Sequence, residues 1–393
     1  MKKLFIIAFW AIGAFAYELN DNILSNEQNL LFDAQLQKSI KERDFNQLSW
    51  ISPINITLSR SWNKDYLLNK YNKQDRLNIS INQPIFRFGG IYYGIKLSSA
   101  KYNLSKLQIK SKQRELIATA VELLFKIKQT KLSIKKLKLQ LANANLEIKS
   151  VKDLFKAGLS DSIALDTSLA KKTQAKIALL EAKANLKELI AAFKKISYKE
   201  PNTLKLPHLT LIDEEKFLKN NYNIKIANAN SQVANEALKV TKAKYYPSIV
   251  AGANYSKILS HQIPSLPKKQ LNYSISINMP LSINMENDIE IAKYNRLIAK
   301  LNAKIRAKNE AIDYNLVKEK IAIINQKIAF ANQEANLYKK LLKSTKNLYK
   351  AGQKSKLDVD LLKNRVYIKR LDTKIYQIQK QIELLKLYKR VGQ

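Results

Sequence analysis

The sequence of 393 residues contains no cysteine, only eight glycines and eight prolines, and only two histidines. Without cysteine there can be no disulfide, no thiolate metal site and no lipid-accepting thiol. So few glycines and prolines allow few turns, and the chain is therefore expected to consist mainly of long elements. His208 and His261 lie far apart in loop-like segments near prolines, which does not indicate a metal or catalytic site. A phosphate-binding loop and a nucleophile motif are also missing, so we expect no catalytic residue, no cofactor and no enzymatic activity.

Acidic residues are scarce: 32 Asp and Glu stand against 69 Lys and Arg, giving a formal net charge of +37. Such an excess can indicate a nucleic-acid partner. The lysines, however, recur along every expected helix and form no single block, which is typical of solvated helix faces. We favour this second interpretation and expect no nucleic-acid partner.

Residues 1–16 have the pattern of a secretory signal peptide. A basic start at 1–3 is followed by an apolar run over 4–15, and the small residues Ala14 and Ala16 end it. The alternative is a short membrane anchor, but the run is well below the roughly 20 residues that a spanning helix needs. We therefore predict cleavage after Ala16 and export of the mature chain.

A long apolar seam dominates the sequence between Leu116 and Phe155. Apolar residues recur there at alternating steps of four and three, with Thr130 the one polar exception. This heptad spacing predicts a helix packed lengthwise against other helices. The same seam returns from Ile321 to Tyr349, and Ile321 lies 194 residues after Ile127. The chain is therefore expected to be an internal duplication of one long helical hairpin.

The period changes to two in the segments that precede each long helix. Ile54, Ile56 and Leu58 alternate with small polar residues, and a similar alternation returns after Pro247. This predicts strands with one apolar face and one face of small, uncharged polar side chains. Each strand is about as long as the 9–11 residues of a tilted membrane-spanning strand. A soluble sheet with a wet face is the alternative. Four strands cannot close a water-filled barrel without open edges, so several chains must contribute, and three would supply twelve strands.

The duplication divides the mature chain into a first repeat over 17–200 and a second over 201–393. Each repeat should contain a helix, two strands, a long helix and a return helix. The expected bounds are strands at about 51–62 and 76–88, a long helix at about 89–156 and a return helix at about 162–195, then a helix at about 213–244, strands at about 246–257 and 270–283, a long helix at about 285–350 and a return helix at about 357–391.

This order of elements resembles the TolC-like outer-membrane efflux proteins, also called outer-membrane factors. The resemblance covers essentially the whole mature chain. The motifs that carry it are the junction Gln83-Pro84-Ile85-Phe86 through Gly89-Gly90, the turn Phe155-Lys156-Ala157-Gly158-Leu159, and the turn Tyr349-Lys350-Ala351-Gly352 with Ser355-Lys356-Leu357-Asp358-Val359 after it. The second junction, Met279-Pro280-Leu281-Ser282, lacks the glycine pair.

The resemblance implies a mixed, mainly α fold in which long antiparallel coiled-coil helices form a periplasmic α-barrel. Four strands per chain would join a trimeric, twelve-stranded transmembrane β-barrel. The implied function is an outer-membrane channel for a tripartite efflux pump or type I secretion system. Its partners would be a periplasmic adaptor (membrane fusion) protein at the tips Gly158, Leu159 and Gly352, an inner-membrane transporter, and outer-membrane lipid. The alternative from the residues alone is a secreted structural coiled-coil protein of the cell envelope.

The resemblance also implies a periplasmic gate at the helix turns, held shut by polar links. By this comparison Tyr349 and Lys354 carry the links, Asp166 or Asp161 accepts them, and Asp358 contributes to a ring of carboxylates. Lys354 stands where an arginine is usual, so its contact would be a point contact rather than a bidentate one. The alternative is that all five are solvated turn residues.

Overall fold

The computed structural model describes residues 23–65, 70–261 and 268–392. The predicted signal peptide, with Ala14 and Ala16, lies outside these residues. The described chain is mainly helical, with four strands. It divides into two compact units, one formed by the described parts of 1–30, 112–220 and 311–393, the other by 31–111 and 221–310.

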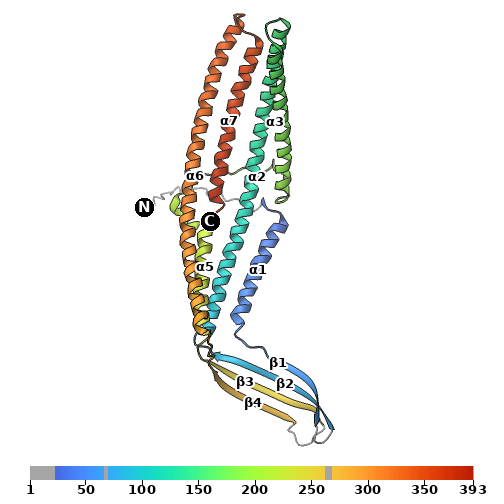
Figure 1. Ribbon diagram of the computed structural model, residues 1–393, viewed down its shortest axis with the longest axis vertical. Helices are drawn as coiled ribbons and strands as arrows, with labels where there is room; N and C mark the ends of the chain where they lie inside the picture. Colours follow the sequence, from blue (N-terminus) through green and yellow to red (C-terminus); the bar gives the residue numbers. More distant parts are fainter. Residues whose placement is uncertain (1–22, 66–69, 262–267, 393) are drawn as a thin grey trace, which may run out of the picture. The chain divides into compact units, whose positions relative to one another are not determined.

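The second unit contains the sheet, drawn as four neighbouring arrows in Figure 1. Its strand order is β1-β2-β3-β4, and every pair is antiparallel. The pairing of β2 with β3 joins the two halves of the duplication. The elements of this unit are α1 (Asn26–Leu48), β1 (Asn55–Asp65), β2 (Lys70–Phe86), α5 (Tyr222–Ala243), β3 (Ser248–His261), β4 (Lys269–Asn278) and the first parts of α2 (Gly90–Lys156) and α6 (Met285–Lys350).

The strands differ from their expected bounds at both ends. β2 begins at Lys70 rather than near 76, and β3 continues to His261 rather than ending near 257. The backbone pairs continue through this polar segment, as between Lys64 and Tyr71, because ladder hydrogen bonds do not require apolar side chains. β4 ends at Asn278, two residues before Pro280, which has no N–H to donate to a ladder.

The first unit is a set of helices, with α7 in contact with both α2 and α6 (Figure 1). Its elements are α3 (Ser162–Lys194), α4 (Glu214–Asn220), α7 (Lys356–Tyr388) and the later parts of α2 and α6. The predicted seam is buried at Ala120 and Ile127 in α2 and at Ile321 and Ala331 in α6. Ile117, Val121 and Phe125 are buried beside it, so α2 is covered on a wider face than a single seam. Within the described residues, none of the helices is both long and apolar enough to cross a membrane.

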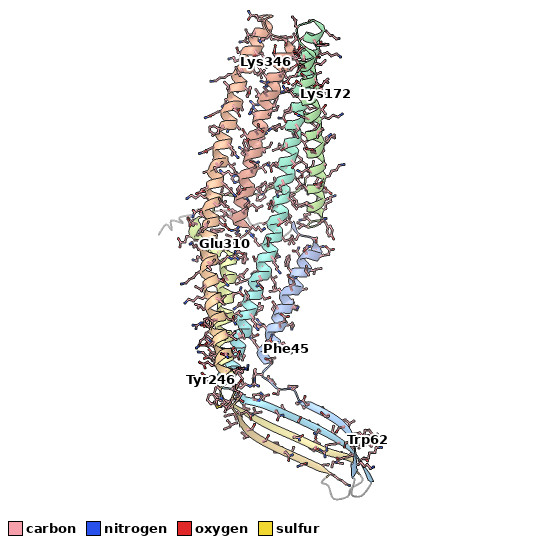
Figure 2. The ribbon with its side chains drawn as sticks, viewed as in Figure 1. Phe45, Trp62, Lys172, Tyr246, Glu310 and Lys346 are labelled. Carbon is pink, nitrogen blue, oxygen red and sulfur yellow. The ribbon has the colours of Figure 1, made fainter. Side chains whose placement is uncertain are left out.

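The helix expected over 213–244 is interrupted, which corrects that prediction. α4 ends at Asn220, Asn221 is extended (φ −67°, ψ 121°), and α5 begins at Tyr222. The Asn221 side chain accepts a hydrogen bond from the Asn223 N–H at 2.8 Å, so it caps the start of α5. Its amide also donates to the buried carboxylate of Glu310, labelled in Figure 2, at 2.8 Å. Asn221 therefore caps a new helix, and its bond to Glu310 holds the capping side chain in place.

An asparagine pair joins α2 to α7. Asn364 is the one position where the four–three rhythm of α7 fails, and its amide donates to the Asn143 Oδ1 at 2.8 Å. The Asn143 side chain is 8% exposed. A polar pair inside an apolar seam is satisfied only when the two residues face each other, so it fixes the register of the two helices.

We predict that Asn364→Leu destabilises the protein by about 1–3 kcal/mol, because the Asn143 amide would stay buried without a partner. Replacing both asparagines by leucine should recover most of this loss. Thermal unfolding followed by far-UV circular dichroism measures both effects. Asn145→Leu, at an exposed position of α2 two residues after Asn143, is the control and should change stability by less than about 0.5 kcal/mol. A double variant as unstable as the single one would contradict the pairing argument.

Candidate functional site

One face of the sheet carries small polar side chains in continuous rows across all four strands. Asn55 pairs with Ser80, Ser80 with Asn254, and Asn254 with Asn272, so these residues share one face. The neighbouring row is Thr57, Asn78, Ser256 and Gln270. No side chain in either row is charged. This face is therefore suited to contact with water rather than to a packed core.

Gly252 lies in a third polar row, between Asn82 and Ser274. A Cβ at this position would lie 2.4 Å from the Ser274 Oγ and 2.9 Å from the Asn82 Oδ1. The two polar side chains therefore lean over the glycine from both neighbouring strands. Glycine in a strand commonly marks such a close approach.

The opposite face is apolar and largely uncovered within the chain. Ile275 and Tyr273 in β4 are each 77% exposed, and Ile56 and Leu58 in β1 are each 70% exposed. Trp62, labelled in Figure 2, lies on the same face near the end of β1 and is 63% exposed. A contiguous apolar face of this kind marks an interface with lipid or protein.

Arg60 interrupts the apolar alternation of β1, and the structure explains how it is accommodated. It pairs in register with Asp75 of β2. Its guanidinium donates two hydrogen bonds, from Nε to Oδ1 at 2.6 Å and from Nη2 to Oδ2 at 2.9 Å. The cross-strand, bidentate pair neutralises the charge of Arg60 on this face.

The first strand-to-helix junction depends on backbone conformations that few residues adopt. Phe88 and Gly89 have φ of 40° and 86°. A Cβ on Gly89 would also meet the Tyr93 ring at 2.9 Å, so glycine is required there. The Gln83 side chain bridges back to the segment before β1, accepting from the Ser52 N–H at 2.9 Å and donating to the Trp50 carbonyl at 3.1 Å.

The second junction lacks this glycine pair and is held by side chains. The Tyr245 hydroxyl donates to Asp288 of α6 at 2.7 Å, and the Lys244 ammonium donates to the same oxygen at 3.1 Å. These two donors hold the pKa of the Asp288 carboxyl below its ordinary value. The strand-to-helix junctions of the two repeats are therefore stabilised by different interactions.

Both hairpin turns use the same helix-ending motif. Gly158 and Gly352 have φ of 73° and 74°. The Gly158 N–H donates to the Phe155 carbonyl and the Leu159 N–H to the Leu154 carbonyl, at 3.1 and 2.8 Å. Gly352 and Gln353 repeat these two bonds after α6. This is the Schellman arrangement, in which a left-handed glycine lets the orphan carbonyls of the last turn find donors.

Two of the five predicted gate residues begin the return helices. Asp161 is the N-cap of α3 and accepts from the Ala164 N–H at 2.7 Å. Asp358 forms a capping box with Ser355 at the start of α7. The Ser355 backbone N–H and hydroxyl donate to Asp358 and, with Lys354 nearby, hold the pKa of its carboxyl below the ordinary value. Sequence reasoning missed these capping roles, although Ser-x-x-Asp ahead of an apolar run is a capping signal.

The other three predicted gate residues are exposed. Tyr349 lies in the last turn of α6, Lys354 lies in the following turn, and Asp166 lies in the second turn of α3. Within the described single chain, no hydrogen bond or ion pair links Tyr349 or Lys354 to Asp161 or Asp166. The chain alone therefore does not bring the predicted latch together.

The two histidines show no sign of a shared site. His208 is an exposed residue between α3 and α4, and the side chain of His261 lies outside the described residues. Among the residues described, no group of three His, Cys, Asp or Glu side chains could hold a metal ion.

Over residues 22–196 and 215–393 the sequence matches the family described as outer membrane efflux protein. The chain belongs to the outer membrane efflux protein family. The two matched segments correspond to the two repeats predicted from the heptad seams. Family membership places the protein in the outer membrane, from which these channels extend into the periplasm.

Solved structures of efflux-family channels share the fold at low sequence identity. CusC, described as forming a transmembrane channel, is 14% identical over 95% of this chain and 90% of its own, with a TM-score of 0.77. VceC from Vibrio cholerae is 13% identical over 95% and 96%, with a TM-score of 0.76. The CmeC outer membrane channel of Campylobacter jejuni is 15% identical over 95% and 84%, with a TM-score of 0.75. No curated protein matches the sequence.

We predict that Gly352→Ala lowers stability by about 1–2 kcal/mol, because an L-residue is strained in the left-handed conformation. Gly94→Ala is the matched control. Gly94 also has open space around its Cβ position, but it lies inside α2 with helical geometry, so alanine should stabilise by about 0.5–1 kcal/mol. Thermal unfolding of the two variants should shift in opposite directions. Shifts of the same sign would argue against the conformational role of Gly352.

Proposed function

We propose that this protein is a homotrimeric channel that conducts exported substrates through the outer membrane, as part of a tripartite efflux pump or a type I secretion system. The observation that carries the proposal is the two-faced sheet with two unpaired edges, β1 and β4. Strand edges in lipid must be hydrogen-bonded. Pairing β4 of one chain with β1 of the next, three times, gives twelve strands with the polar rows inside and Ile275 and Tyr273 facing lipid.

The long helix α6 supports the same assembly. Its buried seam contains Ile321 and Ala331, but a second apolar row along the helix is exposed. That row recurs at steps of seven, first as Ile291, Ile298, Ile305 and Ile312, then as Leu316, Ile323, Phe330 and Leu337. A sustained apolar heptad row requires a second helix to cover it. In the proposed trimer a neighbouring chain supplies that helix.

The hairpin turns are the proposed contact with a periplasmic adaptor protein, which would connect the channel to an inner-membrane transporter. Gly158, Leu159 and Gly352 lie at the turns, and Leu159 is 75% exposed although it is apolar. We propose that the channel is a passive conduit, which substrates cross without a chemical step. A secreted structural coiled-coil protein would be released without detergent, whereas the channel requires detergent for extraction from the outer membrane.

The two helix caps reduce the number of carboxylates that are candidates for the gate link. Asp161 and Asp358 are held by local hydrogen bonds at the starts of α3 and α7. Asp166 is exposed and is the carboxylate left to accept a link. We therefore propose that Tyr349 and Lys354 meet Asp166 in the closed trimer. Each exposed link is worth only about 0–1 kcal/mol, but the three-fold symmetry repeats it.

The sheet faces give a matched test on one strand. Ile275→Lys should reduce membrane insertion by about 2–4 kcal/mol near the bilayer midplane, because a charge would face lipid. Asn272→Leu, three residues away and on the polar face, should insert normally but lower single-channel conductance. Trimer yield in membranes and conductance in planar bilayers measure the two effects. Equal loss of trimer for both variants would contradict the assignment of faces.

The gate test combines Tyr349→Phe with Lys354→Ala and should raise the resting conductance, with the amount of trimer unchanged. Asp166→Asn alone should act in the same direction, whereas Asp161→Asn should affect stability through the lost cap. Tyr338→Phe with Lys346→Ala, on α6 before the turn, is the matched control; Lys346 is labelled in Figure 2. Conductance that stays constant at both low and physiological salt would rule out a latch at these positions.

A further inference from the structure

A groove of about 700 Å³ lies on the first unit, over the side of α7. Its walls come from α2, α6 and α7, all of one chain, and α7 is bonded to both neighbours by Asn364–Asn143 and Thr373–Asn332. The lining is Lys135, Lys138, Leu139, Asn332, Tyr367, Arg370, Leu371, Thr373, Lys374 and Gln377. The groove is therefore complete within one chain, and its volume lies in the range of small-molecule sites.

Four cations line this groove, and no carboxylate does. Within the described residues, none of these four has a hydrogen bond or ion pair; they are Lys135, Lys138, Arg370 and Lys374. Their sequence neighbours behave differently. Lys136 is paired with Asp372 at 2.7 Å, and Lys369 with Glu334 at 2.9 Å. The local carboxylates thus neutralise cations that do not line the groove.

The spacing of these cations is unfavourable for the isolated helices. Lys135 and Lys138 are three residues apart on α2, and Arg370 and Lys374 are four apart on α7. Like charges at these spacings repel each other along a helix. A bound anion would relieve repulsion on both helices at once.

Part of the groove lining is not charged. Leu139 and Leu371 are apolar and partly buried, and the Tyr367 ring is 46% exposed beside them. The Thr373 hydroxyl donates to the Asn332 side chain at 2.9 Å, which leaves the Asn332 amide able to donate. An anion alone would meet the cations but leave the apolar surface wet.

We propose that this groove binds amphipathic organic anions, small molecules with an apolar ring system and one sulfonate, sulfate or carboxylate group. The acidic group would lie among the four cations, and the apolar body would cover Leu139, Leu371 and the Tyr367 ring. Both parts are needed, because exposed cations alone bind ions weakly in salt, and the apolar area adds the burial term. This site is separate from the proposed gate and does not depend on conduction.

The test uses the full mature chain in lipid nanodiscs at physiological salt, with empty nanodiscs subtracted. The probe is 8-anilinonaphthalene-1-sulfonate, followed by fluorescence titration. Its neutral counterpart is N-phenyl-1-naphthylamine, which has the same ring skeleton without the sulfonate. Inorganic sulfate is the charge-only competitor. We expect saturable binding of the sulfonate at one site per chain, at least tenfold weaker binding of the neutral compound, and little competition by sulfate.

The diagnostic variant is Lys135→Gln with Lys374→Gln, which should weaken sulfonate binding at least tenfold. The matched control is Lys149→Gln with Lys363→Gln, on the same two helices and with the same loss of charge. These exposed lysines do not line the groove. Along the helix axes they lie about 16–21 Å from the mutated pair, beyond a Debye length. The control should bind within twofold of the parent, and the melting temperatures of all three should agree.

Three results would overturn the proposal. Equal weakening in both double variants would mean that only net charge matters. Equal binding of the neutral compound would mean that the cations have no role. Full displacement by inorganic sulfate at physiological strength would mean a simple counter-ion site with no apolar contribution.

Discussion

Burial of one apolar seam along each long helix is the interaction on which the rest of this structure depends. Helices of 67 and 66 residues with so many lysines gain their stability from tertiary packing rather than from the helix itself. Ala120 and Ile127 in α2, and Ile321 and Ala331 in α6, supply that packing. Surface outside these contacts can carry the many lysines that give the chain its net charge of +37.

The need to cover apolar surface also applies to the surface that one chain leaves exposed, and it favours assembly of several chains. α6 covers one seam within the chain and leaves a second heptad row, including Ile298 and Phe330, exposed. The sheet likewise leaves one apolar face and two edges open. The helix and the sheet thus both need a partner chain, and the proposed closed ring of identical chains would cover the heptad row and pair the strand edges.

Local periodicity explains why much of the fold could be predicted, and long-range contacts explain what could not. The seams, the strand alternation and the turn glycines follow from spacing within a few residues. The break at Asn221 depends on Glu310, 89 positions away, and the polar exception at Asn364 on Asn143, 221 positions away. At the turns the resemblance suggested gate roles for Asp161 and Asp358. The structure adds that Asp161 accepts from the Ala164 N–H and Asp358 from the Ser355 N–H and hydroxyl, so both cap the return helices.

Scarcity of carboxylates connects the turns to the groove. With 32 acids for 69 bases, each carboxylate used in one contact leaves cations elsewhere without a partner. Asp161 and Asp358 are used by helix caps, and Asp372 and Glu334 by single lysines between neighbouring helices. Charge repulsion is then lowest if the surplus cations spread over wet surface, as most of them do. The four that gather over Leu139 and Leu371 depart from that pattern, and an anion with an apolar body is the ligand that satisfies both surfaces.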